Sequence, residues 1–388
     1  MEKKKTFKVT EIFKSFFKSQ QNSGVLLVLF AVISLIAANS PLNETYQRFI
    51  HYSTKNNFHL PSTNLDWMNE GFMTLFFLLI GIEIKRELYE GELKTRKNAM
   101  LPLIGALGGM IIPAVIYCIV NFNSPATLSG AGIPMATDIA FAIAILGLLG
   151  NRIPTELKIF LTALAIIDDL GAIVIIAIFY GHGLHFTWLM SSLAICILMF
   201  LLNKKTTTPL LVYVLIGFAL WYCILQSGIH ASISGVLFAF LLPNNNLEKI
   251  NISNKIEHLL NKPVAFIVLP LFAATNTALS LNNASLDFSS PISLGVFGGL
   301  LIGKPLGIFG FSYLSSKLNI ASISPNISLK NLLGASFLGG IGFTMSIFIT
   351  NLAFSNIDYA NIGKISILFA SSIAAIIGYF ICKRRSFI

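Results

Sequence analysis

FLTALAIIDDLGAIVIIA, residues 160–177, places two adjacent aspartates, Asp168 and Asp169, in an otherwise apolar stretch. Carboxylates are costly in the hydrocarbon core of a bilayer and are usually kept there for a function. A buried carboxylate has to be protonated, paired with a cationic group or bound to a cation. All three states are needed if a cation and protons compete for one site, so the pair favours an ion transporter.

The composition of the chain is typical of a membrane protein. Of its 388 residues, 55% are hydrophobic and 11% are charged, whereas soluble domains carry about 25% charged residues. A membrane helix needs about 20 apolar residues, and the longest uncharged runs hold one or two each: residues 99–137, 170–203, 206–247 and 331–357. The four cysteines show no metal or disulfide spacing. The sequence therefore predicts an all-α polytopic membrane protein.

The apolar segments predict twelve transmembrane helices in a single domain, residues 23–382. A cytoplasmic N-terminal segment, residues 1–22, would precede this domain, and a basic cytoplasmic tail, residues 383–388, would follow it. The expected spans are 23–38, 68–86, 99–119, 131–149, 155–179, 186–202, 209–225, 229–242, 261–280, 291–313, 331–351 and 362–382.

The positions of Lys and Arg give the orientation of these spans. When loops alternate between two sides, 23 of the 27 basic residues fall on one side, three fall on the other, and Lys304 lies within a span. Cytoplasmic loops carry the excess of basic residues, so both termini are predicted to be cytoplasmic. The net charge of +10 follows from this bias, and no nucleic-acid partner is expected.

The N-terminal region leaves alternatives open. The first apolar stretch ends in small residues, 37–40, as a signal peptide does, but cleavage there would leave the six N-terminal lysines unexplained. An uncleaved first helix is therefore expected. Residues 7–17 mix Phe and Lys as in a short interfacial helix, and a disordered basic tail explains them equally well. In the longest outward loop, residues 51–59 predict a small hairpin, whose edge could pair between subunits.

The ionisable groups expected at membrane depth are few: Asp138, Asp168, Asp169 and Lys304. Adjacent residues of a helix project about 100° apart, so Asp168 and Asp169 face different neighbours. Two carboxylates in a medium of low dielectric cannot both ionise cheaply, and they titrate as a coupled pair. Hard oxygen ligands suit Na+ and Li+, although a protonated aspartate that serves only packing is the simpler alternative.

Lys304 lies among glycines at four-residue spacing, Gly299, Gly303 and Gly307. Such a stripe predicts close approach of another helix on that face. It would place the ammonium group against a neighbouring helix, and Asp168 is its expected partner. The alternative, a lysine that reaches out to the membrane interface, fits its central position less well.

Two segments resemble helices broken at membrane depth. In one, Gly132 and Pro134 precede Thr137 and Asp138, and the other is the glycine-rich stretch 339–344. Unwound backbone is tolerated in a membrane where it lines a cavity or is buried in protein. The breaks fall in the middle helices of two three-helix units, spans 3–5 and 10–12, which favours an inverted-repeat transporter with discontinuous spans 4 and 11. Tight packing alone would also explain the glycines.

Charged residues gather at the cytoplasmic end of the second expected span. Glu83 and Glu87 lie one helical turn apart with Arg86 between them. Glu257 and His258 lie near the start of the ninth span. A solvated helix end explains these residues, and a cluster that senses pH is the functional alternative, because histidine titrates near neutrality.

The chain resembles the NhaA family of bacterial Na+/H+ antiporters. The resemblance covers roughly residues 20 to 382 and is carried by long motifs: FLLIGIEIKREL at 77–88, ATDIAFA at 136–142, LAIIDDLGA at 164–172, LIGKPLG at 301–307 and GIGFTMS at 340–346. It implies a pH-regulated, electrogenic secondary transporter of the bacterial inner membrane, not an enzyme. It also implies exchange of cytoplasmic Na+ or Li+ for external H+, about two H+ per Na+, by alternating access. No cofactor is expected.

By this resemblance Asp169 is the main Na+ ligand, and Asp168 pairs with Lys304 when no cation is bound. Thr137 and Asp138 match the unwound stretch beside the site. Members of the expected pH-sensing group, which includes His258, match positions associated with pH activation: Glu83, Arg86, Glu87 and Glu257. The outward hairpin matches a homodimer contact, and membrane lipids surround the protein. Asn254 and Asn261 stand where some relatives carry a basic residue and a histidine. The resemblance therefore does not fix the pH profile of this chain.

Three other classes of protein fit the sequence less well. An intramembrane aspartyl protease also needs two buried aspartates, but on different helices and usually with a Gly-Asp pair, which this chain lacks. A Na+-coupled solute symporter on a similar fold would need a roomy polar cavity, and the polar groups expected at membrane depth are few and small. A channel is disfavoured because no filter repeat or acidic ring occurs.

Overall fold

The computed structural model describes residues 22–53, 58–181, 183–203, 209–243, 252–279, 281 and 287–383. These residues form helices, and their single extended pairing is an isolated antiparallel bridge between Ser53 and Thr63. The bridge lies where the hairpin was expected, but residues 54–57 fall outside the described part. The expected interfacial helix before residue 22 and the tail after Lys383 fall outside it as well.

Seven helices of the described chain are long and apolar enough to cross a membrane, or eight if one bent pair counts as a span. The protein is thus an all-helical, multi-pass membrane protein. The seven are Asn64–Tyr89, Asn98–Val120, Thr155–Phe179, Ile252–Asn276, Pro291–Lys317, Leu329–Ala353 and Ile357–Lys383. The bent pair joins Pro125–Met135 to Ile139–Leu148, and four apolar helices are shorter: Asn22–Ala38, Phe186–Leu202, Leu210–Gln226 and Ser232–Leu241.

The chain divides into two compact units. Unit 1 comprises Met1–Ile33, Thr95–Asp169 and Leu279–Ile388. Its helices are α5 (Arg96–Val120), η3 (Pro125–Met135), α6 (Ile139–Leu148), η4 (Gly150–Arg152), the first part of α7 (Thr155–Phe179), α13 (Pro291–Phe297), η6 (Gly298–Gly303), α14 (Lys304–Lys317), α15 (Leu329–Gly339), α16 (Phe343–Ala353) and α17 (Ile357–Lys383).

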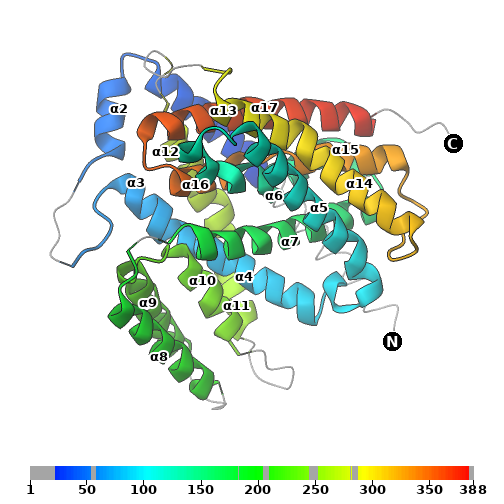
Figure 1. Cartoon of the computed structure of the whole chain (residues 1–388). Helices are drawn as coiled ribbons and strands as arrows, with labels where there is room; N and C mark the ends of the chain where they lie inside the picture. Colours follow the sequence, from blue (N-terminus) through cyan, green and yellow to red (C-terminus); the bar gives the residue numbers. More distant parts are fainter. Residues whose placement is uncertain are drawn as a thin grey trace. The chain divides into compact units, whose positions relative to one another are not determined.

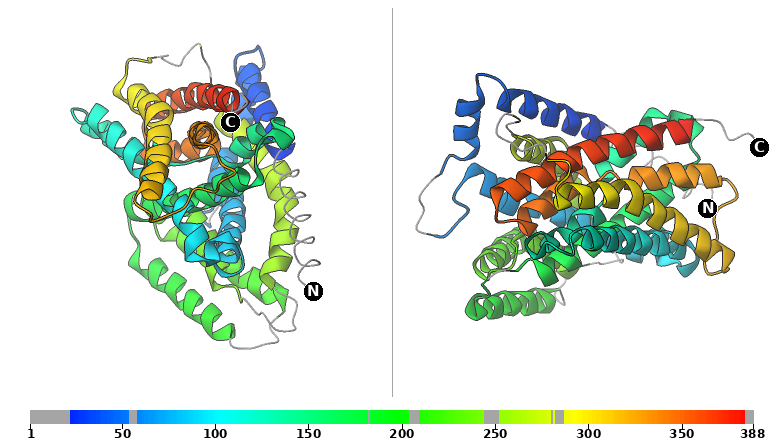
Figure 2. Two further views of the ribbon diagram at one scale, coloured as in Figure 1. Left: turned by 90° about the vertical axis from the view of Figure 1, so that its right-hand side faces the viewer. Right: turned by 45° about the horizontal axis from the view of Figure 1, so that its top comes forward.

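Unit 1 is built on the tight contact of α5 with α14, which lie side by side (Figure 1 and Figure 2). A Cβ atom at Gly307 would come within 2.5 Å of the Gly108 carbonyl carbon, and one at Gly303 would lie 2.7 Å from the Pro113 Cα. The glycine stripe thus allows the two backbones to touch, as its spacing predicts.

Adding one methyl group at Gly307 is expected to destabilise the protein, since the added Cβ would overlap the α5 backbone. Gly307→Ala should cost about 1–3 kcal/mol of folding free energy, typical of an overpacked contact. Gly310, one turn further along α14, offers a matched control because a Cβ there meets nothing within 4 Å. Thermal unfolding in detergent measures both variants, and a Gly307→Ala protein as stable as Gly310→Ala would contradict this packing.

Unit 2 comprises Ser34–Lys94 and Leu170–Ala278. In it, α4 packs closely on α10, where a Cβ at Gly81 would lie 2.7 Å from the Ala239 Cβ. Its helices are α2 (Asn43–Ile50), α3 (Asn64–Asp66), η1 (Trp67–Phe72), α4 (Met73–Tyr89), η2 (Glu92–Lys94), α8 (Phe186–Leu202), α9 (Leu210–Gln226), α10 (Ser232–Leu241), α11 (Ile252–Pro263), η5 (Val264–Val268) and α12 (Leu269–Asn276).

Most helices lie where the apolar runs predict them, and α7 has the expected bounds, Thr155–Phe179. The ninth span differs. It was expected at 261–280, but the helix begins at Ile252 and continues through Pro263 into the π-helix η5. The π-helix η5 follows Pro263 directly, so the helix continues past this proline. Glu257 therefore lies inside a helix, 8% exposed.

Candidate functional site

Two helix breaks meet inside unit 1. The first lies between η3 and α6, which are bent by 44°, and residues 136–138 there are extended. The second lies between α15 and α16 at residues 340–342. The Asp138 amide donates to the Ile341 carbonyl at 2.7 Å, and the Thr137 hydroxyl lies 2.7 Å from the Gly339 carbonyl oxygen. The unwound backbone groups of one break are thus satisfied by the other.

Asp138 caps two half-helices at once. Its carboxylate accepts from the Phe141 amide at 2.9 Å, in the first turn of α6. It also accepts from the amide and the hydroxyl of Thr344, at 3.1 and 2.6 Å, in the first turn of α16. Helix N-termini carry a partial positive charge, so Asp138, which is 2% exposed, offsets two converging positive ends.

Asp168 and Lys304 form an ion pair with no solvent exposure on either side chain. The Lys304 ammonium donates to Asp168 Oδ2 and, at 2.9 Å, to the Thr137 hydroxyl oxygen. The second oxygen, Asp168 Oδ1, is buried and has no hydrogen-bond partner among the described residues. A buried charged oxygen left in this state is costly, so it is a candidate ligand for a cation or a proton.

Thr137 provides one proton for two acceptors. Its hydroxyl lies 2.6 Å from Asp168 Oδ2 and 2.7 Å from the Gly339 carbonyl oxygen. A hydroxyl donates once and accepts through its lone pairs. A proton on Asp168 would resolve the competition, because Asp168 would then donate to Thr137 while Thr137 donates to Gly339. The arrangement therefore accommodates both an ionised and a protonated Asp168.

Asp169 follows Asp168 on α7 and is 1% exposed. It lies within electrostatic reach of Lys304, although the ion pair itself is made by Asp168. The two aspartates thus have different surroundings, as expected for helical neighbours about 100° apart.

The structure adds features to the site that the sequence did not predict. Lys304 directly follows the π-helix η6, Gly298–Gly303, and is followed by Pro305. Ser346 donates to the Ile133 carbonyl at 2.7 Å and so ties α16 to η3. Thr344 stood in the quoted motif GIGFTMS, but nothing in that motif indicates that its hydroxyl reaches Asp138.

The charged residues expected to sense pH come together in unit 2. Arg86 on α4 forms an ion pair with Glu257 on α11, and its second nitrogen, Nη2, lies 3.7 Å from Glu87 Oε1. Glu83 is buried, and its Oε1 has no hydrogen-bond partner among the described residues. His258 is exposed, and it interacts with the neighbouring Glu257 only electrostatically.

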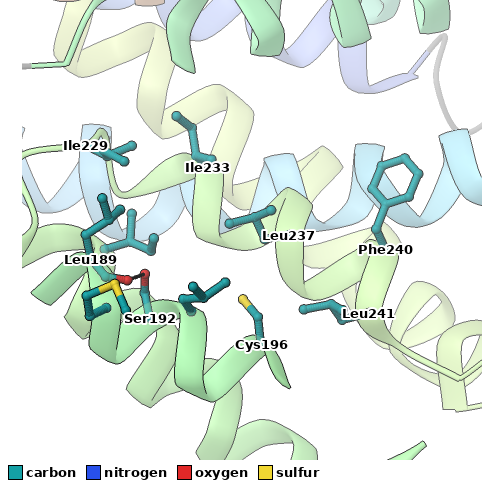
Figure 3. Close-up of a pocket in the computed structure, with 11 residues that line it drawn as sticks. Leu189, Ser192, Cys196, Ile229, Ile233, Leu237, Phe240 and Leu241 are labelled. Atoms are coloured by element: carbon teal, nitrogen blue, oxygen red, sulfur yellow. Dashed lines mark hydrogen bonds between the residues drawn. The ribbon is translucent and has the colours of Figure 1, made fainter. Parts of the chain in front are cut away.

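An apolar groove of about 470 Å³ lies between α8, α9 and α10 (Figure 3). Aliphatic side chains such as Leu189, Ile233 and Leu237 line it, with Ser192 and Cys196 beside them. It carries no charged side chain and could not hold a cation. It also does not provide the roomy polar cavity that a solute symporter would need. The described residues contain no cluster of three or more His, Cys, Asp or Glu that could bind a metal ion.

Comparison with known proteins identifies relatives of nearly the same length. Residues 14–382 match the family model described as Na+/H+ antiporter 1. The chain is 50% identical over 378 residues to the Na(+)/H(+) antiporter NhaA of Flavobacterium psychrophilum, covering 97% of both chains. It is 45% identical over 377 residues to the Na(+)/H(+) antiporter NhaA of Vibrio vulnificus, covering 96% of both.

Among solved structures, the chain is similar to the sodium proton antiporter MjNhaP1 from Methanocaldococcus jannaschii at pH 8. The TM-score is 0.51 with 14% sequence identity, over 97% of both chains. At this identity the likeness extends to the fold alone.

Proposed function

Because this chain belongs to the Na+/H+ antiporter 1 family, we propose that it exchanges cytoplasmic Na+ or Li+ for external H+ at the site around Asp168 and Asp169. The observation that carries the site assignment is the buried Asp168–Lys304 ion pair with one carboxylate oxygen left over. Asp169 is the principal cation ligand, and Asp168 and Thr137 complete the site. Na+ and H+ are the cargo, and the exchange requires no cofactor.

The exchange follows from competition for the same oxygens. In the cation-free state, Lys304 holds Asp168. A bound Na+ would draw both carboxylates toward itself, and the ammonium would lose its partner. A lysine without its counter-ion at such a depth releases its proton readily. Two titrating groups for one cation are consistent with two H+ per Na+. Each cycle then moves net charge, and the membrane potential drives Na+ outward.

Asp138 keeps this site in place, because its carboxylate accepts from three donors at the N-termini of the two half-helices. By the same logic Lys304 offsets the converging negative ends of the half-helices. A bundle with opposed half-helices suits alternating access, in which the site is exposed first to one side and then to the other.

The topology we propose has twelve spans with both termini in the cytoplasm, within the bacterial inner membrane. The eight candidate spans and the four shorter apolar helices together account for this number. The basic residues, 23 on one side and three on the other, support the orientation. A homodimer contact through the outward loop around the Ser53–Thr63 bridge and annular membrane lipids complete the assembly.

The direct test is an exchange assay in everted membrane vesicles. An imposed pH gradient should relax on addition of Na+ or Li+ with no organic substrate present. This result separates an antiporter from a Na+-coupled solute symporter, which carries no protons and would leave the pH gradient unchanged. If the pH gradient persists after Na+ and after Li+ are added, the proposed function is overturned.

We further propose that the charge cluster of unit 2 regulates activity with pH. Glu257→Gln removes one carboxylate and leaves Arg86 to interact with Glu83 and Glu87. The remaining carboxyl groups of the cluster then ionise at a lower pH. The midpoint of the pH–activity profile should move toward acid by about half a unit or more, the size expected for losing one neighbouring charge. The maximal rate should stay within about twofold, since the variant leaves the cation site intact.

Glu44→Gln is the matched control for this variant, because Glu44 is an exposed acid of the same unit, paired with Arg48. Its pH–activity profile should equal that of the unmodified protein. If Glu257→Gln also leaves the profile unchanged, the cluster does not regulate. The same assay across pH shows how Asn254 and Asn261, which depart from some relatives, affect activation.

A further inference from the structure

The segment that leads into the first helix break is an unusually long 3-10 helix. η3 runs over eleven residues, Pro125–Met135, whereas 3-10 runs longer than three or four residues are uncommon and often mark a hinge. A 3-10 helix rises about 2.0 Å per residue and an α-helix about 1.5 Å. Over this length the 3-10 form reaches roughly 5 Å further. Relaxation of η3 to an α-helix would therefore withdraw Thr137 from the ion pair.

Tyr117 of α5 and Asn121, the residue directly after α5, hold the beginning of η3. The Thr127 hydroxyl lies 2.6 Å from Asn121 Oδ1 and 2.8 Å from the Ser124 carbonyl oxygen, and the Tyr117 hydroxyl donates to the Thr127 carbonyl at 3.1 Å. Asn121 in turn donates to the Tyr117 carbonyl at 3.0 Å and to the Pro291 carbonyl, at the start of α13, at 2.9 Å. These three residues, which we call the η3 anchor, connect the segment to two scaffold helices.

The η3 anchor is almost as deeply buried as the cation site. Asn121 and Tyr117 have no exposed surface, and Thr127 is 6% exposed. The Tyr117 ring packs against Gly130, where a Cβ atom would lie 2.7 Å from the ring carbon Cζ. Buried hydrogen bonds of this kind are costly to break, because the groups left behind find no water. The anchor is therefore a rigid attachment rather than a surface contact.

The other end of η3 is held at the cation site. Ser346 donates to the Ile133 carbonyl at 2.7 Å, and the Thr137 hydroxyl lies 2.9 Å from the Lys304 ammonium. The segment is thus fixed at one end by the anchor and at the other end by the half-helices that carry the site. A shift of η3 at the anchor would therefore also move Thr137.

We propose that Thr127, Asn121 and Tyr117 are positioning residues: they hold η3 in its extended 3-10 form and thereby set the distance of Thr137 from Lys304 and Asp168. This inference rests on the proposed function, since it assigns the anchor a part in cation binding. None of the three residues touches the ion pair, so their effect on binding is indirect.

The test compares Thr127→Val with Thr127→Ser in reconstituted vesicles. Valine keeps the shape and removes the hydroxyl, so the apparent KM for Na+ should rise about tenfold, as expected for losing one buried hydrogen bond. Serine restores the hydroxyl and should return the KM to near its original value. The maximal rate should change less than the KM, whereas a merely destabilised protein would lose rate in proportion to the folded fraction.

Ser129→Ala is the matched control, because Ser129 lies on the same segment and donates to the Ala353 carbonyl at 2.9 Å, away from α5. Its KM should stay unchanged. If Thr127→Val does not fold, Tyr117→Phe replaces it, since it removes one hydroxyl and keeps the ring, and its KM should rise in the same direction. An unchanged KM in the folded variant, or an equal rise in Ser129→Ala, overturns the inference. Failure of the proposed function is distinguishable, because the unmodified protein would then show no Na+-dependent exchange.

Discussion

Asp169→Asn is expected to abolish Na+-dependent proton exchange while leaving the protein folded. The amide keeps the size of the carboxyl group but carries no charge and does not titrate, so neither Na+ nor H+ can be held there as before. Without this carboxylate the site loses the charge that attracts the cation, and each loss of about 1.4 kcal/mol of cation binding lowers the affinity tenfold. The rate at a fixed Na+ concentration should therefore fall at least about 100-fold. Fluorescence of a pH-sensitive dye in everted vesicles measures it.

The control for this variant is Asp358→Asn, which removes the charge of an exposed aspartate on α17 of the same unit and should transport normally. Purified Asp169→Asn protein should also lose the rise in thermal stability that Na+ gives the unmodified protein, because a ligand stabilises the state that binds it. Retained exchange at saturating Na+ would show that Asp169 is not the principal ligand.

The charged residues of the candidate site could be predicted from the sequence, because charged groups at membrane depth are energetically unfavourable. Acids and a lysine at membrane depth require compensation, which singled out Asp168, Asp169, Asp138 and Lys304 from an apolar sequence. The glycines beside Lys304 indicated close helix approach, and the structure has this approach between α14 and α5. Gly132 and Pro134 likewise marked the first helix break and the glycines of 339–342 the second, since these residues weaken a helix interior.

The remaining features of the site depend on long-range contacts that leave no pattern in the sequence. The π-helix η6 before Lys304 and the 3-10 form of η3 are two such features. The hydroxyl of Thr344 reaches Asp138 only because the two breaks meet. A threonine in an apolar helix usually bonds within its own turn, so sequence alone gives no reason to choose this one.

The ninth span was placed wrongly for a local reason. The expected start at residue 261 lies just before the apolar run that begins at Val264, because charged residues such as Lys255, Glu257 and Lys262 precede that run. The structure begins the helix at Ile252 and makes the preceding turns amphipathic, with Ser253, Ile256 and Glu257 buried. Amphipathic turns at the end of a membrane helix escape a search for continuous hydrophobicity.

Lys304→Ala is expected to destabilise the protein strongly and to change how many charges move per Na+. It leaves Asp168 buried with its charge uncompensated, and breaking a buried pair from one side costs about 3–5 kcal/mol. Part of this loss should be recovered at low pH, where a proton neutralises Asp168 in place of the lysine. Thermal unfolding in detergent at several pH values measures the effect, and Lys317→Ala, at the exposed end of the same helix, should show neither change.

The double variant Asp168→Asn/Lys304→Gln separates the structural role of the pair from its part in transport. With both charges removed, the side chains can still hydrogen-bond and no buried charge is left alone, so most of the stability should return. Transport should not return, because the double variant also lacks the Asp168 carboxylate, which we propose as part of the cation site. If Lys304→Ala still moves net charge with each Na+ in reconstituted vesicles, Lys304 is not an obligatory proton carrier, and the second proton must come from Asp168 beside Asp169.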